Sequence, residues 1–427
     1  MRIVHINTAD NQGGAARAAF RLHTGLLEAG HDSAMLVGRA VDRRPEIADV
    51  HPTPLAARAA RRAIGEVERL TGLQYLLGWW GDQIASHPLV RNADVIHLHN
   101  LHGGFFPIRT LPALSRVAPL VWSVCDFWMM TGHCSYPSFA GCDKWRSGCG
   151  TCPDLGDYPA ISVDTTALLW RTKRSLYAQC EGTVVAKSRW ALELLNDSPL
   201  LAGFQKEYVP NGYRTEVFRP FDKAAARQAL GLPPGARTVF VGAPDLSSRR
   251  KGADQIGHVL AAVGQQVPGL TIIAVGQDTR STIEEHAGYR VFRAGYVQND
   301  ALLAACYNAA DATLLTSLAD NSPNVMYESL SCGVPVAAYR VGGIPDAVLD
   351  METGLLATAG DADAIAASLV RLLSDDALRA RLGSGARALM LRSFSLDLQV
   401  ERFSSLYTRL VAARCGAASA LPVHLAP

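Results

Sequence analysis

Two carboxylates with a polar loop between them form the segment best suited to chemistry. Asp320 and Glu328 are separated by seven residues, and helical composition begins near Val325. The start of a helix presents backbone N–H groups without partners inside the helix, at its positive end, and this arrangement suits a phosphate. Glu328 would lie one turn inside the helix, where a carboxylate can accept hydrogen bonds from sugar hydroxyls.

The polar residues around this helix start are candidate binding groups. They are Asn321, Ser322 and Asn324, and the apolar Val325 at the same helix start is a further candidate. A simpler interpretation is also open, in which Asn321 and Asn324 only cap the helix and Glu328 is a solvated surface residue.

Three adjacent cations stand in a long loop after the apolar run at residues 238–242. They are Arg249, Arg250 and Lys251, and Gly252 follows them. Such a cluster can neutralise the negative charge of a diphosphate leaving group, but charge runs are also common on solvated surfaces. The sequence permits both.

Four cysteines are grouped within residues 134–152. Cys134, Cys142, Cys149 and Cys152 have the spacing Cys-x7-Cys-x6-Cys-x2-Cys, and the last step is typical of zinc sites. Such a zinc ion would be structural, because it would stabilise a loop that lacks a core. Disulfides and free thiols are the alternatives, and the odd total of nine cysteines argues against a disulfide framework.

Glycines and histidines follow apolar runs in the first half of the chain. A glycine pair lets the backbone approach phosphates or an incoming acceptor. The candidates are Gly13 and Gly14 for donor binding, Asp126 for catalysis, and His97, His99 and His133 for the acceptor side.

Alternating apolar runs and helical segments must position these residues. The runs lie at 2–6, 33–37, 95–98, 120–124, 183–186, 238–242, 271–276 and 312–315. This alternation predicts an α/β protein with two Rossmann-like, doubly wound domains that face a central cleft, with functional loops after the strands.

Turn residues near 209–212 mark the predicted domain boundary. The first domain is residues 1–212, with a cysteine-rich insert at 131–153, and the second is residues 213–395. We expect a C-terminal helix at 396–414 to pack back on the first domain.

Length, charge and hydropathy limit the class of protein. A chain of 427 residues is too long for one ordinary core, and its formal net charge of +2 is too small for a nucleic-acid-binding protein. The N-terminus lacks the apolar core of a signal peptide, and no apolar window approaches the roughly 20 residues of a membrane span. We therefore expect a cytoplasmic protein.

The donor segment resembles the signature of retaining GT-B glycosyltransferases of glycosyltransferase family 4. That signature has two carboxylates separated by seven residues and then a Cys-Gly-x-Pro-Val stretch, as at Asp320, Glu328 and residues 332–336. Lys251-Gly252 and Gly342-Gly343 also match family positions. The resemblance covers both predicted domains.

The resemblance implies a role for each matched residue. Glu328 would hold the ribose hydroxyls, Asp320 would face the donor sugar, and Lys251 would contact the diphosphate of a UDP- or GDP-sugar. Gly342 and Gly343 would close the pocket. The family transfers sugars with retention by front-face displacement, and no metal is required for catalysis.

This sequence departs from the family pattern at three places. Asp320 stands where glutamate is commoner, Ala243 where arginine is usual, and Cys125 where histidine is usual before Asp126. The arginine role would pass to Arg249 or Arg250.

The insert at 131–153 resembles a branch of the family found in surface-polysaccharide biosynthesis. That branch often uses glycan or lipid-linked glycan acceptors, which makes peripheral contact with the inner membrane useful. The basic stretch at 56–69 is suited to anionic headgroups or to a solvated helix. Alternative functions are a noncatalytic nucleotide-sugar or polysaccharide binding protein and a GT-B nucleotide-sugar epimerase.

Overall fold

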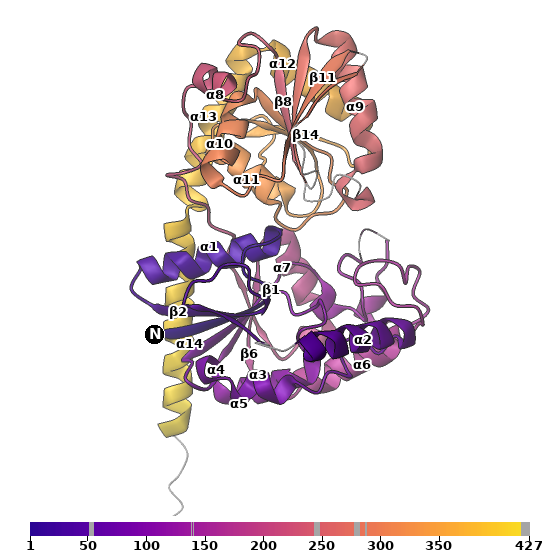
Figure 1. Ribbon diagram of the computed structural model, residues 1–427, viewed down its shortest axis with the longest axis vertical. Coiled ribbons are helices and arrows are strands. Elements are labelled where there is room, and N and C mark those ends of the chain that lie inside the picture. Colours follow the sequence, from indigo (N-terminus) through magenta and orange to yellow (C-terminus); the bar gives the residue numbers. More distant parts are fainter. Residues whose placement is uncertain are drawn as a thin grey trace, which may run out of the picture. The chain divides into compact units, whose positions relative to one another are not determined.

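The computed structural model describes residues 1–50, 55–137, 139, 141–242, 248–276, 282–286 and 288–419, with only the backbone at 55–58, 282–283 and 417–419. The chain divides into two compact units (Figure 1). Unit 1 contains Met1–Pro210 and Gln399–Pro427, and unit 2 contains Asn211–Leu398. Each unit is built on one seven-stranded sheet.

The sheet of unit 1 has the strand order β3-β2-β1-β4-β5-β6-β7, and all its strands are parallel. Its strands are β1 (Arg2–Ala9), β2 (Asp32–Arg39), β3 (Ile47–Asp49), β4 (Val95–Leu98), β5 (Leu120–Ser123), β6 (Gly182–Ala186) and β7 (Gln205–Tyr208). The helices that connect them are α1 (Gly14–Glu28), α2 (Leu55–Thr71), α3 (Gly81–Ser86), α4 (Pro88–Arg91), α5 (Leu111–Val117), α6 (Thr166–Tyr177) and α7 (Arg189–Asn196).

The sheet of unit 2 has the order β10-β11-β9-β8-β12-β13-β14, in which only the β10–β11 pair is antiparallel among the described strands. Its strands are β8 (Thr238–Gly242), β9 (Leu270–Val275), β10 (Thr282–His286), β11 (Tyr289–Gly295), β12 (Ala312–Leu315), β13 (Val336–Tyr339) and β14 (Gly354–Ala357). Its helices are α8 (Lys223–Ala229), α9 (Ala253–Gln266), α10 (Asp300–Ala309), α11 (Asn324–Ser331), α12 (Ala362–Ser374) and α13 (Asp376–Ser393).

Continuous apolar runs form the central strands because helices cover both faces of each sheet. All four residues of β4, β5, β12 and β13 are buried. The prediction of two Rossmann-like, doubly wound α/β domains is therefore confirmed. The antiparallel edge strand β10 was not predicted.

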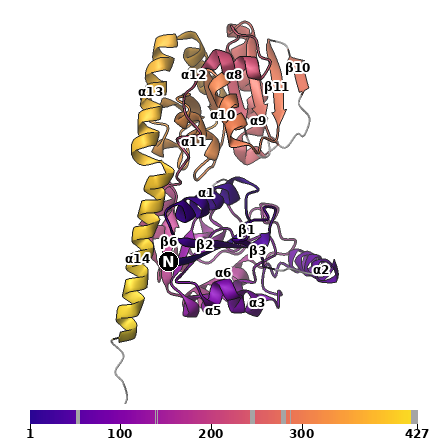
Figure 2. The same ribbon diagram turned by 60° about the vertical axis from the view of Figure 1, so that its left-hand side comes forward.

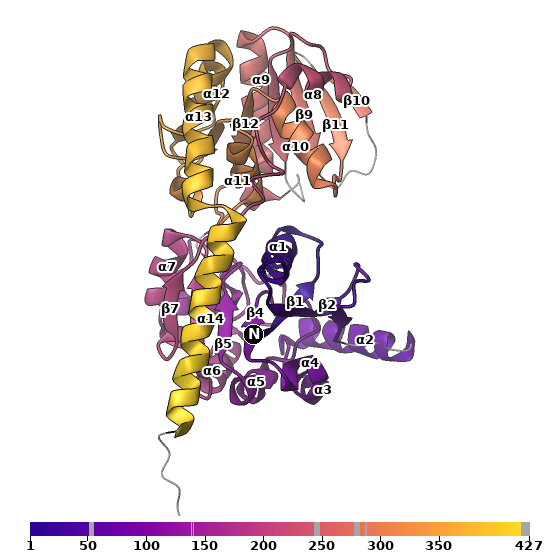
Figure 3. The same cartoon turned by 90° about the vertical axis from the view of Figure 1, so that its left-hand side faces the viewer.

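The last helix, α14 (Leu396–Ser419), belongs to unit 1 from Gln399 onward. It lies along the sheet of that unit, where Arg409 forms an ion pair with Glu207 of β7 at 2.5 Å (Figure 3). Phe403 and Tyr407 are fully buried on its inner side. None of the helices in the described residues is long and apolar enough to cross a membrane.

Candidate active site

Three loops of unit 2 carry the residues predicted to bind the donor. Lys251 follows β8, Asp320 follows β12 and Gly342 follows β13. These strands are parallel neighbours in the sheet, so their carboxyl ends meet at one edge. The topology thus brings together residues that span 91 positions of the sequence, from Lys251 to Gly342.

An ion pair joins the first two of these loops. The Lys251 ammonium donates a hydrogen bond to Asp320 Oδ2, and the Ser317 hydroxyl lies 3.4 Å from the same oxygen. The Asp320 side chain is 7% exposed and that of Lys251 is 21% exposed. Electrostatic attraction in such a weakly hydrated place is stronger than in bulk water.

Two glycines allow the loops to approach so closely. Gly342 has φ +53°, and a Cβ added to it would lie 2.0 Å from the carbonyl oxygen of Asp320. The N–H of Gly343 donates to that same oxygen at 3.0 Å. At Gly252, with φ +75°, an added Cβ would lie 2.1 Å from the carbonyl oxygen of Thr316. Any side chain at either position would push the donor loops apart.

Glu328 lies inside α11 and is buried, with 3% of its surface exposed. The Tyr307 hydroxyl donates to Glu328 Oε2 at 2.9 Å. The alternative that Glu328 is a solvated residue is therefore wrong. A buried carboxylate must have hydrogen-bond partners, and sugar hydroxyls are suitable ones.

Pro323 is the N-cap residue of α11 and makes no side-chain capping bond. Asn324, the first residue of the helix, accepts a hydrogen bond from the Tyr213 hydroxyl at 2.8 Å, and Ser322 lies 3.5 Å from the Asn211 amide. Asn321 is buried, while Val325 is partly exposed.

The three adjacent cations have different partners in the structure. Arg250 donates from Nη1 to the carbonyl oxygen of Ala319 at 2.7 Å, so it holds the Asp320 loop. The Arg249 side chain is 82% exposed and lies 3.5 Å from Asp254. Only Lys251 pairs with a predicted donor carboxylate in the described part of the loop.

In unit 1, Gly13 and Gly14 stand between β1 and α1. Gly13 has φ +92° and is the N-cap residue of α1. A Cβ built on it meets no atom within 4 Å in the described structure, and Gly14 is exposed. The glycine pair thus leaves open space before a helix start, as the predicted backbone approach to a ligand requires.

The structure corrects the prediction for His97 and His99. Both are buried in the core of unit 1, with exposures of 0% and 4%. His97 bonds the hydroxyls of Tyr407 (2.6 Å) and Ser123 (2.7 Å), and His99 Nε2 lies 3.0 Å from His5 Nδ1. Alternate side chains of a strand share a face, and in β4 this face points into the core. An acceptor cannot reach either ring.

Burial keeps these histidines neutral. It lowers the pKa of His99 to about 3, and with the neighbouring imidazoles it lowers the pKa values of His5 and His97 well below the usual range. Their ligand atoms lie within 4.8 Å of one another. Because both ring nitrogens of His97 already bond hydroxyls, we interpret the cluster as a polar part of the core.

His102 is a further candidate in the same histidine run, which the sequence analysis did not select, and it is buried with 5% of its surface exposed. Its Nε2 lies 2.7 Å from Asp126 Oδ2, and its Nδ1 lies 3.2 Å from the Tyr158 hydroxyl. His102 follows β4 and Asp126 follows the neighbouring parallel strand β5, so both stand at the edge where doubly wound sheets bind ligands. The available signal was its position just beyond the end of the strand.

Cys125 occupies the place next to this pair. It is partly buried, and burial raises the pKa of its thiol to about 12. The side chain is therefore a neutral thiol and cannot supply the charge of a protonated histidine. Asp126 then depends on His102 as its imidazole partner.

His133 lies with the cysteines of the insert. It is 1% exposed, its Nδ1 is 3.1 Å from the carbonyl oxygen of Pro159, and its Nε2 is 3.3 Å from Cys152 Sγ. The prediction that His133 contacts the acceptor is corrected by this burial. Cys134, Cys142, Cys149 and Cys152 line one pocket, and all are free thiols.

Comparison with known proteins finds similarity to glycosyltransferases. Residues 235–375 match the family model described as glycosyl transferases group 1. The chain is 25% identical over 357 residues to the putative colanic acid biosynthesis glycosyl transferase WcaC of Escherichia coli (strain K12). This match covers 79% of this chain and 83% of that protein.

Two further matches differ in extent. The D-inositol 3-phosphate glycosyltransferase of Acidothermus cellulolyticus is 36% identical over 226 residues, and the match spans about half of each protein (49%). The structure of Anabaena HepE in complex with UDP-glucose superposes with a TM-score of 0.66 at 16% identity, over 96% of this chain and 99% of that one. Residues 235–375 therefore resemble group 1 glycosyl transferases, and the chain has the GT-B fold.

Proposed function

We propose that this chain is a retaining glycosyltransferase that moves a sugar from a UDP- or GDP-sugar to a glycan or lipid-linked glycan in surface-polysaccharide biosynthesis. The observation that carries the proposal is the Lys251–Asp320 pair at one edge of the unit 2 sheet, together with buried Glu328 on α11. The name of WcaC supports the polysaccharide role, and the UDP-glucose bound to HepE supports a UDP-sugar donor.

The donor site separates the tasks of its residues. The first-turn amides of α11 bind the phosphates, since they carry the positive end of the helix. Glu328 accepts hydrogen bonds from the ribose hydroxyls while Tyr307 fixes its second oxygen. When a diphosphate draws the Lys251 ammonium toward it, Asp320 becomes free to accept from a hydroxyl of the donor sugar.

The reaction itself is a front-face displacement. The bond between the anomeric carbon and the β-phosphate oxygen breaks, and the oxygen keeps the electron pair. The acceptor oxygen bonds the same face of the anomeric carbon and gives its proton to the departing phosphate. Lys251 stabilises the charge that develops on the leaving group, which is the kind of preorganised electrostatic contact that lowers a barrier most. No metal is part of this proposed reaction.

We assign a positioning role on the acceptor side to His102. Its hydrogen bonds to Asp126 and Tyr158 hold the imidazole at the end of β4. Asp126 Oδ1 accepts from the Trp128 N–H at 3.1 Å, and a carboxylate oxygen can accept a second hydrogen bond, here from a sugar hydroxyl. This arrangement takes the place of the family's histidine, where this chain has the neutral Cys125 thiol.

A donor screen tests the proposal. The purified chain is incubated with a panel of UDP- and GDP-sugars, with and without lipid-linked glycan extracts, and nucleotide release is measured. We expect acceptor-dependent release from one donor, and a product whose anomeric configuration by NMR equals that of the donor. Binding without release would favour the noncatalytic alternative, release with inversion would contradict retention, and a changed free nucleotide sugar would indicate an epimerase.

We also propose that α2 contacts anionic membrane surface. Figure 2 shows α2 extending away from the sheet of unit 1. On its described part Arg62 is exposed, Val67 and Leu70 are 46% and 50% exposed, and Trp79 beyond the helix is 65% exposed. A basic helix with exposed apolar side chains is typical of interfacial contact. This site would lie at the cytoplasmic face of the membrane.

Vesicle sedimentation tests the membrane contact. The protein should sediment with vesicles that contain anionic lipid and not with neutral ones, and Arg62→Glu should weaken this binding. A single basic residue contributes about 1 kcal/mol near an anionic surface. Arg340→Glu, at an exposed ion pair of unit 2, is the matched control. Equal binding to neutral vesicles, or none to either, would contradict the contact.

A further inference from the structure

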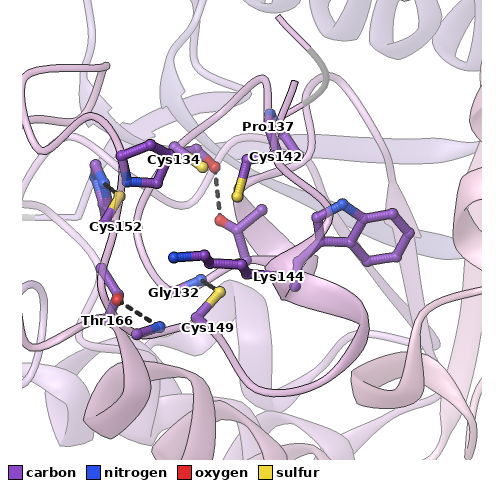
Figure 4. A pocket seen from close by; sticks show the side chains of 13 residues that line it. Gly132, Cys134, Pro137, Cys142, Lys144, Cys149, Cys152 and Thr166 are labelled. Carbon is purple, nitrogen blue, oxygen red and sulfur yellow. Dashed lines mark hydrogen bonds between the residues drawn. The ribbon is translucent and has the colours of Figure 1, made fainter. Parts of the chain in front are cut away.

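The segment between Met130 and α6 gathers four thiols around one space. Figure 4 shows the side chains of Cys134, Cys142, Cys149 and Cys152 around the pocket that they line. Apart from the 3-10 turn at Lys144–Arg146, the described residues of this segment form no regular helix or strand. The segment therefore lacks the backbone ladder that stabilises the rest of unit 1.

We infer that these four thiolates bind one structural zinc ion. Four sulfur donors in tetrahedral arrangement favour zinc, and a site with four protein ligands has no open position for a substrate. The ion would supply the cross-links that the segment otherwise lacks. This inference is independent of the proposed transfer reaction.

The turn that carries the Cys-x2-Cys step is held in an unusual conformation. Its successive φ values are +142° at Gly148, +56° at Cys149, +103° at Gly150 and +44° at Thr151. The left-handed region is unfavourable for cysteine and threonine, and such residues persist where other contacts hold them. These contacts come from the Lys144 ammonium, which donates to the Thr151 carbonyl and, at 2.8 Å, to its hydroxyl.

A backbone N–H also points at one of the sulfurs. Gly132 donates to Cys149 Sγ at 3.2 Å. Hydrogen bonds from the surroundings orient metal ligands and stabilise their charged form. Gly132 can come this near only as glycine, because an added Cβ would lie 2.6 Å from the carbonyl oxygen of Thr166.

The Cys149–Cys152 half of the cysteine group is fastened at the start of α6. Cys152 N–H donates to Asp164 Oδ2 at 2.8 Å, and Gly150 N–H donates to Thr166 Oγ1 at 2.9 Å. Gly132, at the start of the insert, also lies against Thr166. The two ends of the insert thus meet at the start of α6.

The thiols are gathered but still apart. Among the described residues no three of these sulfurs lie within 4.8 Å of one another. Zinc–sulfur bonds are about 2.3 Å long, so binding must draw the sulfurs inward. The absence of regular secondary structure in the described part of the insert permits that movement.

Two lysines suit the charge of the site. Four thiolates and one zinc ion carry a net charge of −2, because four negative charges meet two positive ones. Lys144 lines the pocket. Buried Lys173 donates to the carbonyl oxygens of Trp128 (2.6 Å) and Thr131 (3.0 Å), next to the insert.

His133 is a fifth donor close to the group, and we assign it a positioning role. Its Nδ1 faces the carbonyl oxygen of Pro159, and its Nε2 faces Cys152 Sγ at 3.3 Å. The imidazole thereby fixes the position of one ligand without joining the set of four.

Backbone bonds connect the zinc segment to the His102–Asp126 pair. Ser135, next to Cys134, accepts from Phe127 N–H and donates to the Tyr158 carbonyl, both at 2.9 Å. Tyr158 in turn contacts His102 with its hydroxyl. The zinc ion would therefore hold Tyr158 and the Asp126 loop in place, and this last step rests on the proposed function.

Metal analysis of the full-length chain tests the site directly. Protein purified without added metal or chelator should contain one zinc per chain, and Cys149→Ser should lose it. Cys415→Ser, which changes an exposed cysteine near the end of α14, is the matched control and should keep it. His133→Gln should also keep the zinc. A zinc content near zero in wild type, iron in its place, or two disulfides found by mass would overturn the assignment.

Cobalt substitution covers the case in which Cys149→Ser does not fold. Wild-type protein from which zinc has been removed should bind one Co²⁺ and develop the intense sulfur-to-cobalt charge-transfer bands and the visible bands of a tetrahedral thiolate site. Loss of zinc from His133→Gln, or cobalt bands of an octahedral oxygen and nitrogen site, would overturn the four-thiolate ligand set. Nucleotide release measured on the same samples reports separately on the proposed transfer.

Discussion

The donor loops of unit 2 and the histidines of unit 1 show how position along a strand decides function. Lys251, Asp320 and Gly342 all lie beyond the carboxyl ends of parallel strands, and they meet. His97 lies within β4, and its side chain is buried against α14. Residue type alone does not separate His97 from Lys251, whereas position does: Lys251 follows a strand and pairs with Asp320, and His97 lies inside a strand that α14 covers.

The largest effect that we predict is at the donor ion pair. Lys251→Ala should lower kcat/KM by about 10²–10³, because it removes a preorganised charge at the leaving group. Glu328→Gln should lower it to a similar degree, since it removes the negative charge and replaces one of the two accepting oxygens by an NH2 donor. Nucleotide release with the preferred donor is the measurement.

A surface cation of the same unit provides the control for this prediction. Arg237→Ala removes a cation from an exposed pair with Asp376 and should leave turnover unchanged. Normal turnover by Lys251→Ala, with its unfolding midpoint preserved, would remove the donor assignment. A loss in both variants would indicate a general effect of charge.

The second prediction concerns the His102–Asp126 pair of unit 1. His102→Ala should lower turnover by about 10²-fold, because a small misplacement of a group that orients a substrate can cost this much. Asp126→Asn should have a similar effect, and the double variant should be no worse than the more damaged single variant, because the two residues act as a unit. Independent, multiplicative losses would contradict the pair.

The sequence predicted the fold and much of the donor segment, and physical reasons explain both results. Doubly wound sheets leave continuous apolar runs and strand-end loops, which are local features. Glu328 and Asp320 stand in one such loop and helix. The partners of these residues are distant, however. Neither the Tyr307–Glu328 bond nor the role of Gly342 against Asp320 can be inferred before the strand order is known.

The histidines could not be assigned for a related reason. His97 lies in β4 and His99 directly follows that strand, but the sequence does not show that α14 covers His97 some 310 residues later. Only this packing turns a plausible ligand group into a buried network. His102, three residues beyond His99, is buried as well, and what distinguishes it is its bond to Asp126.

A third prediction concerns the glycine between the donor loops. Gly342→Ala should raise the KM for the donor about 10-fold and destabilise the chain by about 1–3 kcal/mol, since the new Cβ must displace the Asp320 backbone. Gly257→Ala, on α9 where an added Cβ meets no atom of the described structure, is the control and should be neutral or stabilising. An unchanged KM for Gly342→Ala would separate this loop from the donor.

The smallest effect on turnover should come from the buried histidines. Burial lowers the pKa values of these histidines in the folded chain. In the unfolded chain a histidine has its usual pKa near 6.5, so below this pH the unfolded chain binds more protons than the folded one. The contribution of these neutral histidines to the free energy of unfolding should therefore be fully present above pH 6.5. It should decrease as the pH falls from 6.5 toward about 3, the pKa of His99 in the folded chain. Denaturant unfolding at pH 7.5 and 5.5 measures this slope.

Removing one member of the cluster separates this structural role from catalysis. His99→Gln should lower stability at pH 7.5 by about 1–3 kcal/mol, since it disturbs a buried hydrogen-bond network, but it should also flatten the decline between pH 7.5 and 5.5. Exposed His258→Gln should leave the slope as it is. If His99→Gln instead lost turnover while keeping the wild-type pH slope, the cluster would belong with the functional residues and the contrast between strand interior and strand end would fail.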